Sequence, residues 1–393
     1  YYSGVQGADA TADAVLVLEP SGDSHITYLY MNPRSTRDTD AFYRDAKYGE
    51  LWVGRRFTLD EAKARYQIDT RHLNELEALL GDGKETLTLR NVDPAVDPKV
   101  KKHEREAEFE TFVSEQRLCK DEYEIRELQA AVDATALGFN DVIHAMPAAV
   151  ETPRGERVLD AAFYGRARIL GNDLGYNTIV GAGSHACVLH WIRNDGDVRR
   201  GELVLVDAGV EVESFYTADI TRTLPVDGKF TPAQRALYML VYESQLAGFA
   251  AIKPGVLFSE INKACQAVLA KGLADMGVLT VSAEESLKPE VGLHRRWTLH
   301  GVSHHLGLDV HDCAQARKDQ YLDAPLREGM VLTVEPGLYI QPDDELFAPE
   351  YRGIGIRIED DVVVTADGCR NISENIPRHP DEIEKWMKSV LGR

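Results

Sequence analysis

The chain has 393 residues, 44% of them hydrophobic, and a formal charge of −20 at pH 7. This length favours two domains, and the acidic balance argues against nucleic acids and anionic membranes as partners, since both bind basic surfaces. No apolar run reaches the roughly 18 residues of a membrane span, and five cysteines without CxxC spacing favour a reducing, cytoplasmic compartment over a disulfide framework.

The first hundred residues alternate between strand and helix signals. Their patterns predict strands at 14–20, 25–31 and 85–91 and helices at 40–51 and 71–80. The charged stretch that follows, 97–117, predicts a solvated helix joining two domains. The chain opens at YYSGVQG without a methionine and reads like the interior of a fold, so we expect an N-terminal segment to precede it.

The second part of the chain repeats one order of elements. Asp121 and Glu124 form a capping-box pattern before a helical stripe, and a second helix is expected at about 157–171. Thr231 and Pro232 open another helix, and Ser259 is expected to cap the next. Strands are predicted at 202–209, 214–223, 329–340 and 353–365. The repeated order of two helices and then strands suggests two α/β halves packed face to face, with the active site between their sheets.

Four acids interrupt these apolar strands: Asp207, Asp219, Glu335 and Glu359. One such acid is best explained as a salt bridge or a strand end, but four favour a shared metal site, because burying an unpaired carboxylate costs several kcal/mol. Their combined charge of −4 would be cancelled by two divalent cations. Oxygen-rich ligation suits Mn, Co, Fe or Zn, and two such ions can hold a bridging hydroxide for hydrolysis. These residues therefore predict a dinuclear metallohydrolase.

The stretch LHGVSHHLGLDVHD, residues 299–312, holds four histidines. If the stretch is extended, His300 and His304 share one face and His305 points away, as expected for a packing residue. The residues alone do not decide whether His300 or His304 binds metal.

These blocks closely resemble the M24 "pita-bread" metallopeptidases and, within them, the Xaa-Pro aminopeptidases. The resemblance covers nearly the whole chain and is densest in VDAG, YTADITRTLPVDGKFT, LHGVSHHLGLDVHD, GMVLTVEPGLYI and YRGIGIRIEDD. It implies an α/β (α+β) fold class, with a creatinase-like α/β amino domain at 1–118 and a pita-bread catalytic domain at 119–393. It also implies an exopeptidase that releases the first residue of peptides with proline second, by attack of a metal-bridging hydroxide.

The resemblance assigns the metal ligands. It makes Asp207 a chelating ligand of one metal, His304 and Glu335 ligands of the second, and Asp219 and Glu359 bridges between the two. The implied cofactor is a pair of divalent metal ions, with Mn favoured and Zn or Co as alternatives.

The resemblance also implies roles around the metals. Glu335 would act as general base and acid, and His311 would hydrogen-bond the scissile carbonyl oxygen. His190 and His300 would line the proline side of the substrate, and Tyr339 would hydrogen-bond near the metals. Arg357 has two equally supported interpretations, a salt bridge that holds Glu359 and a substrate contact.

The implied partners are proline-containing peptides and further copies of the chain, as a homodimer or homotetramer. Trp52, in the WVGRR block, is by itself more simply explained as core, whereas the resemblance makes it reach a neighbouring subunit's active site. The main alternative function is a prolidase with the same metals; a metal-free interaction protein and a creatinase are weaker. Ser303 lies in no G-x-S-x-G elbow, and GIGIR opens no helix, so serine catalysis and phosphate binding are not supported.

Overall fold

The structure is a computed structural model that describes residues 1–6, 13–81 and 85–392. The chain divides into two compact units, Tyr1–Val113 and Ser114–Arg393. No helix among the described residues is both long enough and apolar enough to cross a membrane.

The first unit is built on a three-stranded sheet. Strands β1 (Val15–Ser21) and β2 (Ser24–Met31) form an antiparallel hairpin, and β3 (Asp69–His72) pairs with β2 in parallel. The other elements of this unit are α1 (Asp40–Arg44), α2 (Glu50–Val53), α3 (Leu59–Tyr66), η2 (Leu73–Glu75), α4 (Leu76–Gly81) and η3 (Asp97–Lys99). Helix α5 (Glu106–Gln116) runs across the boundary between the two units.

Two predictions for this unit are wrong, and two hold only in part: the helix expected at 71–80 begins after β3, and the helix expected at 97–117 forms only at Glu106–Gln116. The helix expected at 40–51 is broken into α1 and α2, because the Asp45 carboxylate accepts the backbone N–H groups of Lys47 and Tyr48 and makes a turn there. The strand expected at 85–91 does not form, since residues 85–89 pair with no strand among the described residues. Arg90 instead donates to the carbonyls of Asp97 and Val100.

The second unit begins with two long helices over a sheet. Helix α6 (Glu122–Glu151) starts at the predicted Asp121–Glu124 capping box, and α7 (Gly155–Leu170) follows. Strands β5 (Ile179–Ala182), β6 (Leu203–Ala208) and β8 (Ile220–Pro225) form an antiparallel sheet in the order β5–β6–β8. The short η4 (Gly183–Cys187) follows β5, and β4 (Asp173–Leu174) pairs with β7 (Val210–Glu211). The strand predicted at 214–223 begins six residues later than expected, at Ile220, and extends to Pro225.

The remainder of this unit repeats the arrangement. Helices α8 (Pro232–Ala251) and α9 (Ser259–Asp275) are followed by the sheet β13–β12–β9 and by the pair β10–β11. The strands are β9 (Val331–Val334), β10 (Gly337–Tyr339), β11 (Gly355–Arg357), β12 (Asp360–Val364) and β13 (Cys369–Asn371). The other elements are α10 (Ala283–Ser286), η5 (Leu293–Arg296), η6 (Pro349–Tyr351) and α11 (Pro380–Val390).

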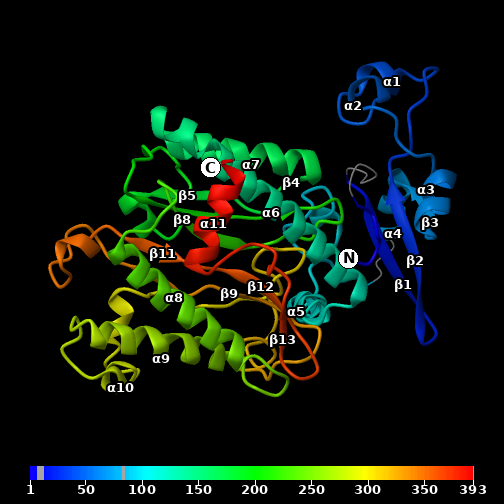
Figure 1. Ribbon diagram of the computed structural model, residues 1–393. Coiled ribbons are helices and arrows are strands. Elements are labelled where there is room, and N and C mark those ends of the chain that lie inside the picture. The colour runs from blue at the N-terminus through cyan, green and yellow to red at the C-terminus, as the bar shows by residue number, and fades with distance from the viewer. Residues whose placement is uncertain (7–12, 82–84, 393) are drawn as a thin grey trace. The chain divides into compact units, whose positions relative to one another are not determined.

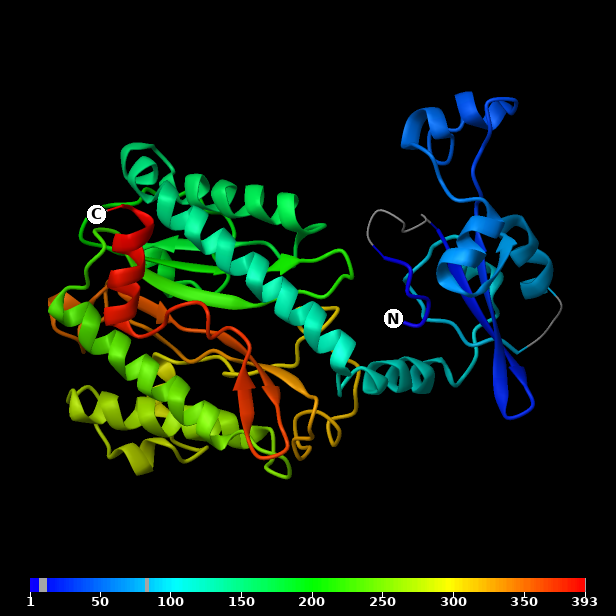
Figure 2. The same cartoon turned by 45° about the vertical axis from the view of Figure 1, so that its right-hand side comes forward.

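The second unit thus consists of layered α/β halves, as the repeated order of elements predicts. In Figures 1 and 2, α6 and α7 cover one side of the stacked sheets and α8 and α9 cover the other. The two halves meet where β8 runs beside residues 357–359: the Glu359 N–H donates to the Thr221 carbonyl at 3.1 Å. Ser259 does not cap α9, because the N-cap is Phe258 and no side chain caps there.

Both carboxy-terminal strand predictions are interrupted at an acid. The run at 329–340 breaks between β9 and β10 at Glu335 and Pro336, since proline has no N–H for a ladder. The run at 353–365 breaks between β11 and β12 at Ile358 and Glu359. Glu335 and Glu359 therefore lie between strands, where the alternation of side chains between the two faces of a sheet does not fix their direction.

Candidate metal centre

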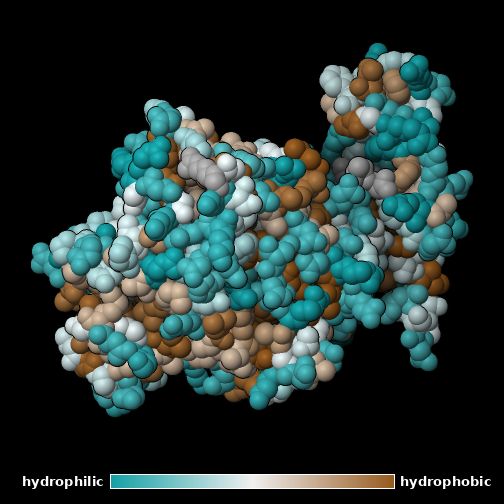
Figure 3. All heavy atoms as spheres, viewed as in Figure 1, coloured by the Kyte–Doolittle hydropathy of each residue, from teal (hydrophilic) through white to brown (hydrophobic). Residues whose placement is uncertain are grey.

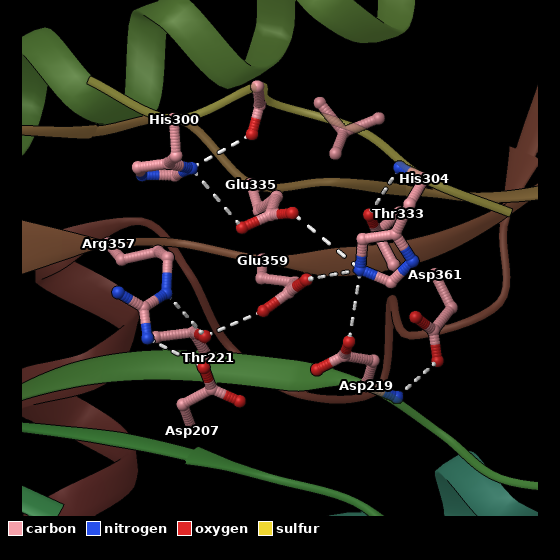
Figure 4. Close-up of polar contacts among 12 residues, drawn as sticks. Asp207, Asp219, Thr221, His300, His304, Thr333, Glu335, Arg357, Glu359 and Asp361 are labelled. Carbon is pink, nitrogen blue, oxygen red and sulfur yellow. Dashed lines mark hydrogen bonds and ion pairs between the residues drawn. The ribbon is translucent and has the colours of Figure 1, made fainter. Parts of the chain in front are cut away.

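The four strand acids converge between the two sheets (Figure 4). Asp207 lies on β6, and Asp219 immediately precedes β8. Glu335 follows β9, and Glu359 lies between β11 and β12. Asp207, Asp219 and Glu359 are buried, at 7%, 5% and 1% exposure, so this acidic cluster is largely shielded from water.

His304 lies at the centre of this cluster. Its Nε2 is 3.3 Å from Asp219 Oδ2, 3.6 Å from Glu335 Oε1 and 4.0 Å from Glu359 Oε1. Its Nδ1 lies 3.1 Å from the His305 carbonyl oxygen, which favours a proton on Nδ1 and directs Nε2 toward the carboxylates. Ligand atoms of Asp219, His304 and Glu359 all lie within 4.8 Å of one another, an arrangement that could hold a metal ion.

Asp207 completes the cluster on the Arg357 side. Arg357 Nη2 donates to Asp207 Oδ2 at 2.6 Å, and the Tyr176 hydroxyl lies 2.6 Å from oxygens of both Asp207 and Asp219. Thr221 Oγ1 donates to Glu359 Oε2 at 2.7 Å, and Arg357 Nε contacts the same Thr221 oxygen. Arg357 therefore contacts Asp207 directly and reaches Glu359 only through Thr221.

The electrostatics of the cluster fit bound cations. Burial raises the pKa of Glu359 well above its usual value, and the neighbouring carboxylates add to the rise. Burial likewise raises the pKa of Asp207, and it raises that of Glu335 to about 7. Burial alone would lower the pKa of His304, but its contact with Asp219 raises it to about 9. Without cations, protons must therefore offset this charge; two divalent ions would offset it with every carboxylate ionised.

His300 lies beside the cluster. Its Nδ1 is 3.5 Å from Glu335 Oε2, and its Nε2 is 2.7 Å from the Tyr339 hydroxyl. Arg357 Nη1 donates to the same hydroxyl at 3.0 Å, so the three side chains form one chain of contacts. Burial, with the nearby Arg357 charge, lowers the pKa of His300 to about 4, which keeps the imidazole neutral at physiological pH.

The other residues singled out by the sequence are three histidines and Trp52. The exposed His311 ring packs edge-on against His304, with 4.5 Å between ring centroids. His190 is exposed in the segment after η4. His305 is buried and packs against Phe258 and Tyr321. Trp52 belongs to the first unit and is 60% exposed, so its interpretation as a core residue is wrong.

Two contacts of the cluster were not found in the sequence. Tyr176 lies 31 residues before Asp207, and its segment does not interrupt an apolar run with an acid as the four strand acids do. Asp361 is buried, and its Oδ2 accepts the Asp219 N–H at 3.1 Å, which orients the chain at that ligand. The pair of acids directly after Glu359 was a usable signal for Asp361.

Comparisons with known proteins agree with this geometry. Residues 126–366 match Metallopeptidase family M24. Xaa-Pro aminopeptidase 1 of Streptomyces coelicolor is 49% identical over 387 residues, which are 97% of this chain and 78% of that protein. An Escherichia coli aminopeptidase P variant in complex with substrate superposes with a TM-score of 0.82 at 33% identity, covering 97% of this chain and 87% of that one.

A zinc-substituted Escherichia coli aminopeptidase P in complex with product matches equally well. Its TM-score is 0.83 at 33% identity, over 98% of this chain and 88% of that one. The predicted α/β pita-bread fold is confirmed by these matches. The chain belongs to metallopeptidase family M24, on its Xaa-Pro aminopeptidase branch.

Proposed function

We propose that the protein is a metal-dependent aminopeptidase that removes the first residue from peptides with proline in the second position. The observation that carries this proposal is the carboxylate cluster around His304, which retains every acid expected from the resemblance, in a chain 49% identical to a Xaa-Pro aminopeptidase. A catalytically dead relative would be expected to have lost at least one of these acids.

Asp207, Asp219, His304, Glu335 and Glu359 would hold two divalent ions. The ions would supply Lewis-acid activation of water and of the peptide carbonyl. Manganese suits a set of four carboxylates and one imidazole, with zinc or cobalt as substitutes. Elemental analysis of the purified protein, followed by reconstitution of stripped protein with each ion, tests the number and the identity of the metals.

Glu335 would move the protons of the reaction. One oxygen lies beside His304 and the other beside His300, so its carboxylate joins the metal cluster to the Tyr339 side of the site. Glu335 would accept the proton of the attacking water and deliver it to the proline nitrogen as the peptide bond breaks. His311, next to His304, would donate a hydrogen bond to the developing oxyanion.

The proline side of the site would be formed by the remaining residues. His300 and Tyr339 are in hydrogen-bond contact and would bound the proline ring, with His190 at the exposed edge. Arg357 binds Asp207 and the Tyr339 hydroxyl, so these contacts support a salt bridge to Asp207 in place of the one expected to Glu359, beside a substrate role.

A prolidase with the same metal cluster remains the alternative. The two activities differ in whether the enzyme accepts residues beyond the proline. Rates on matched Xaa-Pro and Xaa-Pro-Xaa peptides, with Mn, Co or Zn restored, separate them. Efficient cleavage of the tripeptide supports the aminopeptidase, and cleavage of the dipeptide alone would assign a prolidase.

We also propose a homodimer or homotetramer in which Trp52 completes the site of a neighbouring subunit. Apolar side chains gather over α1 and α2 (Figure 3), and Tyr43, Leu51, Trp52 and Val53 are each about half exposed or more. Trp52 Nε1 donates to the Tyr43 carbonyl at 2.8 Å, which fixes one edge of the indole and leaves the ring available as a flat apolar wall.

The variant Trp52→Ala tests this assembly. It should raise KM for proline peptides while bound metal and folding are retained. Light scattering at assay concentration measures the assembly directly, and a fully active monomer would contradict the proposal.

The remaining assignments follow the acidic composition. We propose a cytoplasmic enzyme without nucleic-acid or membrane partners, supported by the charge of −20 and by five cysteines that are all free.

We also propose a creatinase-like domain at 1–118 and the catalytic domain at 119–393. Cell fractionation tests the location, and limited proteolysis tests the boundary.

A further inference from the structure

Glu156 is a buried carboxylate outside the metal cluster. It is the second residue of α7 and is 0% exposed. Its Oε1 lies 2.8 Å from both Ala182 N and His185 Nδ1. Its Oε2 accepts from Trp191 Nε1 at 2.8 Å and from Gly196 N at 2.6 Å. The carboxylate oxygen favours the Nδ1–H tautomer of His185, so each oxygen faces two N–H groups, an arrangement that suits an acceptor-only group.

All four donors belong to one stretch, which we call the 182–196 segment. Ala182 begins it and Gly196 ends it, so one side chain ties both ends; the Glu156 N–H also donates to the Gly196 carbonyl. Within the segment, the Trp191 ring stacks on His185 at 3.9 Å between centroids. A Cβ at Gly196 would lie 2.5 Å from His185 Nδ1, so the packing around the carboxylate leaves no room for a side chain there.

The segment packs against residues of the candidate active site. Ala186 and Cys187 share an apolar cluster with Tyr339, and Trp191 packs against the same cluster. The backbone of η4 also abuts β11, because a Cβ at Gly355 would lie 2.3 Å from the Ala186 carbonyl oxygen. Strand β11 carries Arg357.

The segment also presents His190. His190 lies between Leu189 and Trp191, which both pack against the apolar cluster that contains Tyr339, and the Tyr339 hydroxyl lies 2.7 Å from His300 Nε2. A displacement of the 182–196 segment would therefore move His190 relative to the proline side of the site and loosen the packing of Tyr339.

We propose that Glu156 is a positioning residue: its buried carboxylate fixes the 182–196 segment and thereby holds His190 and Tyr339 in place for the proline side of the substrate. This inference rests on the proposed aminopeptidase function. An amide cannot replace the carboxylate without loss, because in either orientation its NH2 group faces a backbone N–H that loses its acceptor, Ala182 in one and Gly196 in the other.

The test compares Glu156→Gln with a milder and a control variant. Trp191→Phe removes one donor and keeps an aromatic ring against His185. Asp141→Asn is the control: Asp141 accepts two hydrogen bonds from Arg166 and links α6 to α7 without touching the segment. Hydrogen–deuterium exchange of peptides covering 182–196, bound metal, and kcat and KM on a Xaa-Pro-Xaa peptide are measured for each.

Glu156→Gln should speed exchange in the segment and lower kcat/KM on the order of 10- to 100-fold, mainly through KM, with metal content unchanged. Trp191→Phe should change the exchange rate and kcat/KM in the same direction but by less. Asp141→Asn should leave the exchange rate and kcat/KM near their wild-type values. Unchanged exchange in Glu156→Gln, or a loss confined to metal content, overturns the proposal.

A double-mutant cycle with His190→Ala tests whether Glu156 acts through His190. The kcat/KM of the combined variant should be close to that of His190→Ala alone, because Glu156→Gln can no longer act by displacing the His190 imidazole. Fully multiplicative losses would refute that route. If the wild-type protein, loaded with metal, cleaves no Xaa-Pro peptide, the proposed function fails. The exchange experiment would still show whether Glu156 fixes the 182–196 segment.

Discussion

Replacement of Arg222 by methionine should be among the most damaging changes in the second unit. Arg222 is fully buried, and its guanidinium makes five hydrogen bonds. One goes to the Asp360 carboxylate at 2.7 Å and one to the Glu359 carbonyl at 2.6 Å. The others go to the carbonyls of Thr221, Ile376 and Pro377.

The expected cost follows from what the methionine leaves behind. Removing one partner of a buried ion pair costs about 3–5 kcal/mol, because the other charge stays buried without its counterion. Asp360 keeps a 2.8 Å bond from Gln245 and lies 3.6 Å from Arg378, so the lower half of that range is expected. Loss of the bond to the Glu359 carbonyl should also weaken metal binding, by about tenfold if it contributes about 1.4 kcal/mol.

Urea unfolding of the metal-stripped protein and metal titration measure the two effects. The double variant Arg222→Met with Asp360→Leu should be less destabilised than Arg222→Met alone, because the fully buried Asp360 charge is removed together with its partner. Arg200→Met is the control: Arg200 pairs with Asp227 at the surface, and its loss should cost less than about 1 kcal/mol. A loss below about 1 kcal/mol for Arg222→Met, or a double variant worse than the single one, would refute the reasoning.

Three further changes probe the site and its scaffold. Asp219→Asn should abolish activity and lower bound metal, because a neutral amide is a poor bridge between cations; retention of both metals and of turnover would exclude a bridging role. His311→Ala should keep its metals and lose roughly 10²–10³ in turnover, the scale of one oxyanion donor, whereas loss of metal would make His311 a ligand. Asp121→Ala should cost about 1 kcal/mol by urea unfolding, since its side chain accepts the N–H groups of Tyr123 and Glu124; an unchanged midpoint would mean that the cap contributes nothing.

Local signals predicted the elements whose formation depends on local contacts. The Asp121 capping box and the Thr231–Pro232 start of α8 both occur as expected, because a cap is satisfied by residues within three positions. The strand expected at 85–91 is absent, because a strand also requires a partner whose position the local pattern does not contain.

The four acids that the sequence singles out do converge into one cluster, whereas the strands predicted around two of them are interrupted. Glu335 and Glu359 interrupt apolar runs in the sequence, and the chain leaves the regular strands at both residues. Asp207, in contrast, lies within the regular strand β6, so an acid of this cluster does not by itself interrupt a strand.

The sequence by itself determined which residue types could form a cation site, since four carboxylates on apolar strands must be compensated by charge. Only the tertiary structure decided which groups orient them. Tyr176 contacts Asp207 and Asp219 from 31 and 43 positions away, and Arg357 reaches Asp207 across 150 positions. Such contacts depend on how two sheets and their helices pack together, and neither periodicity nor spacing along the chain encodes that packing in a readable form.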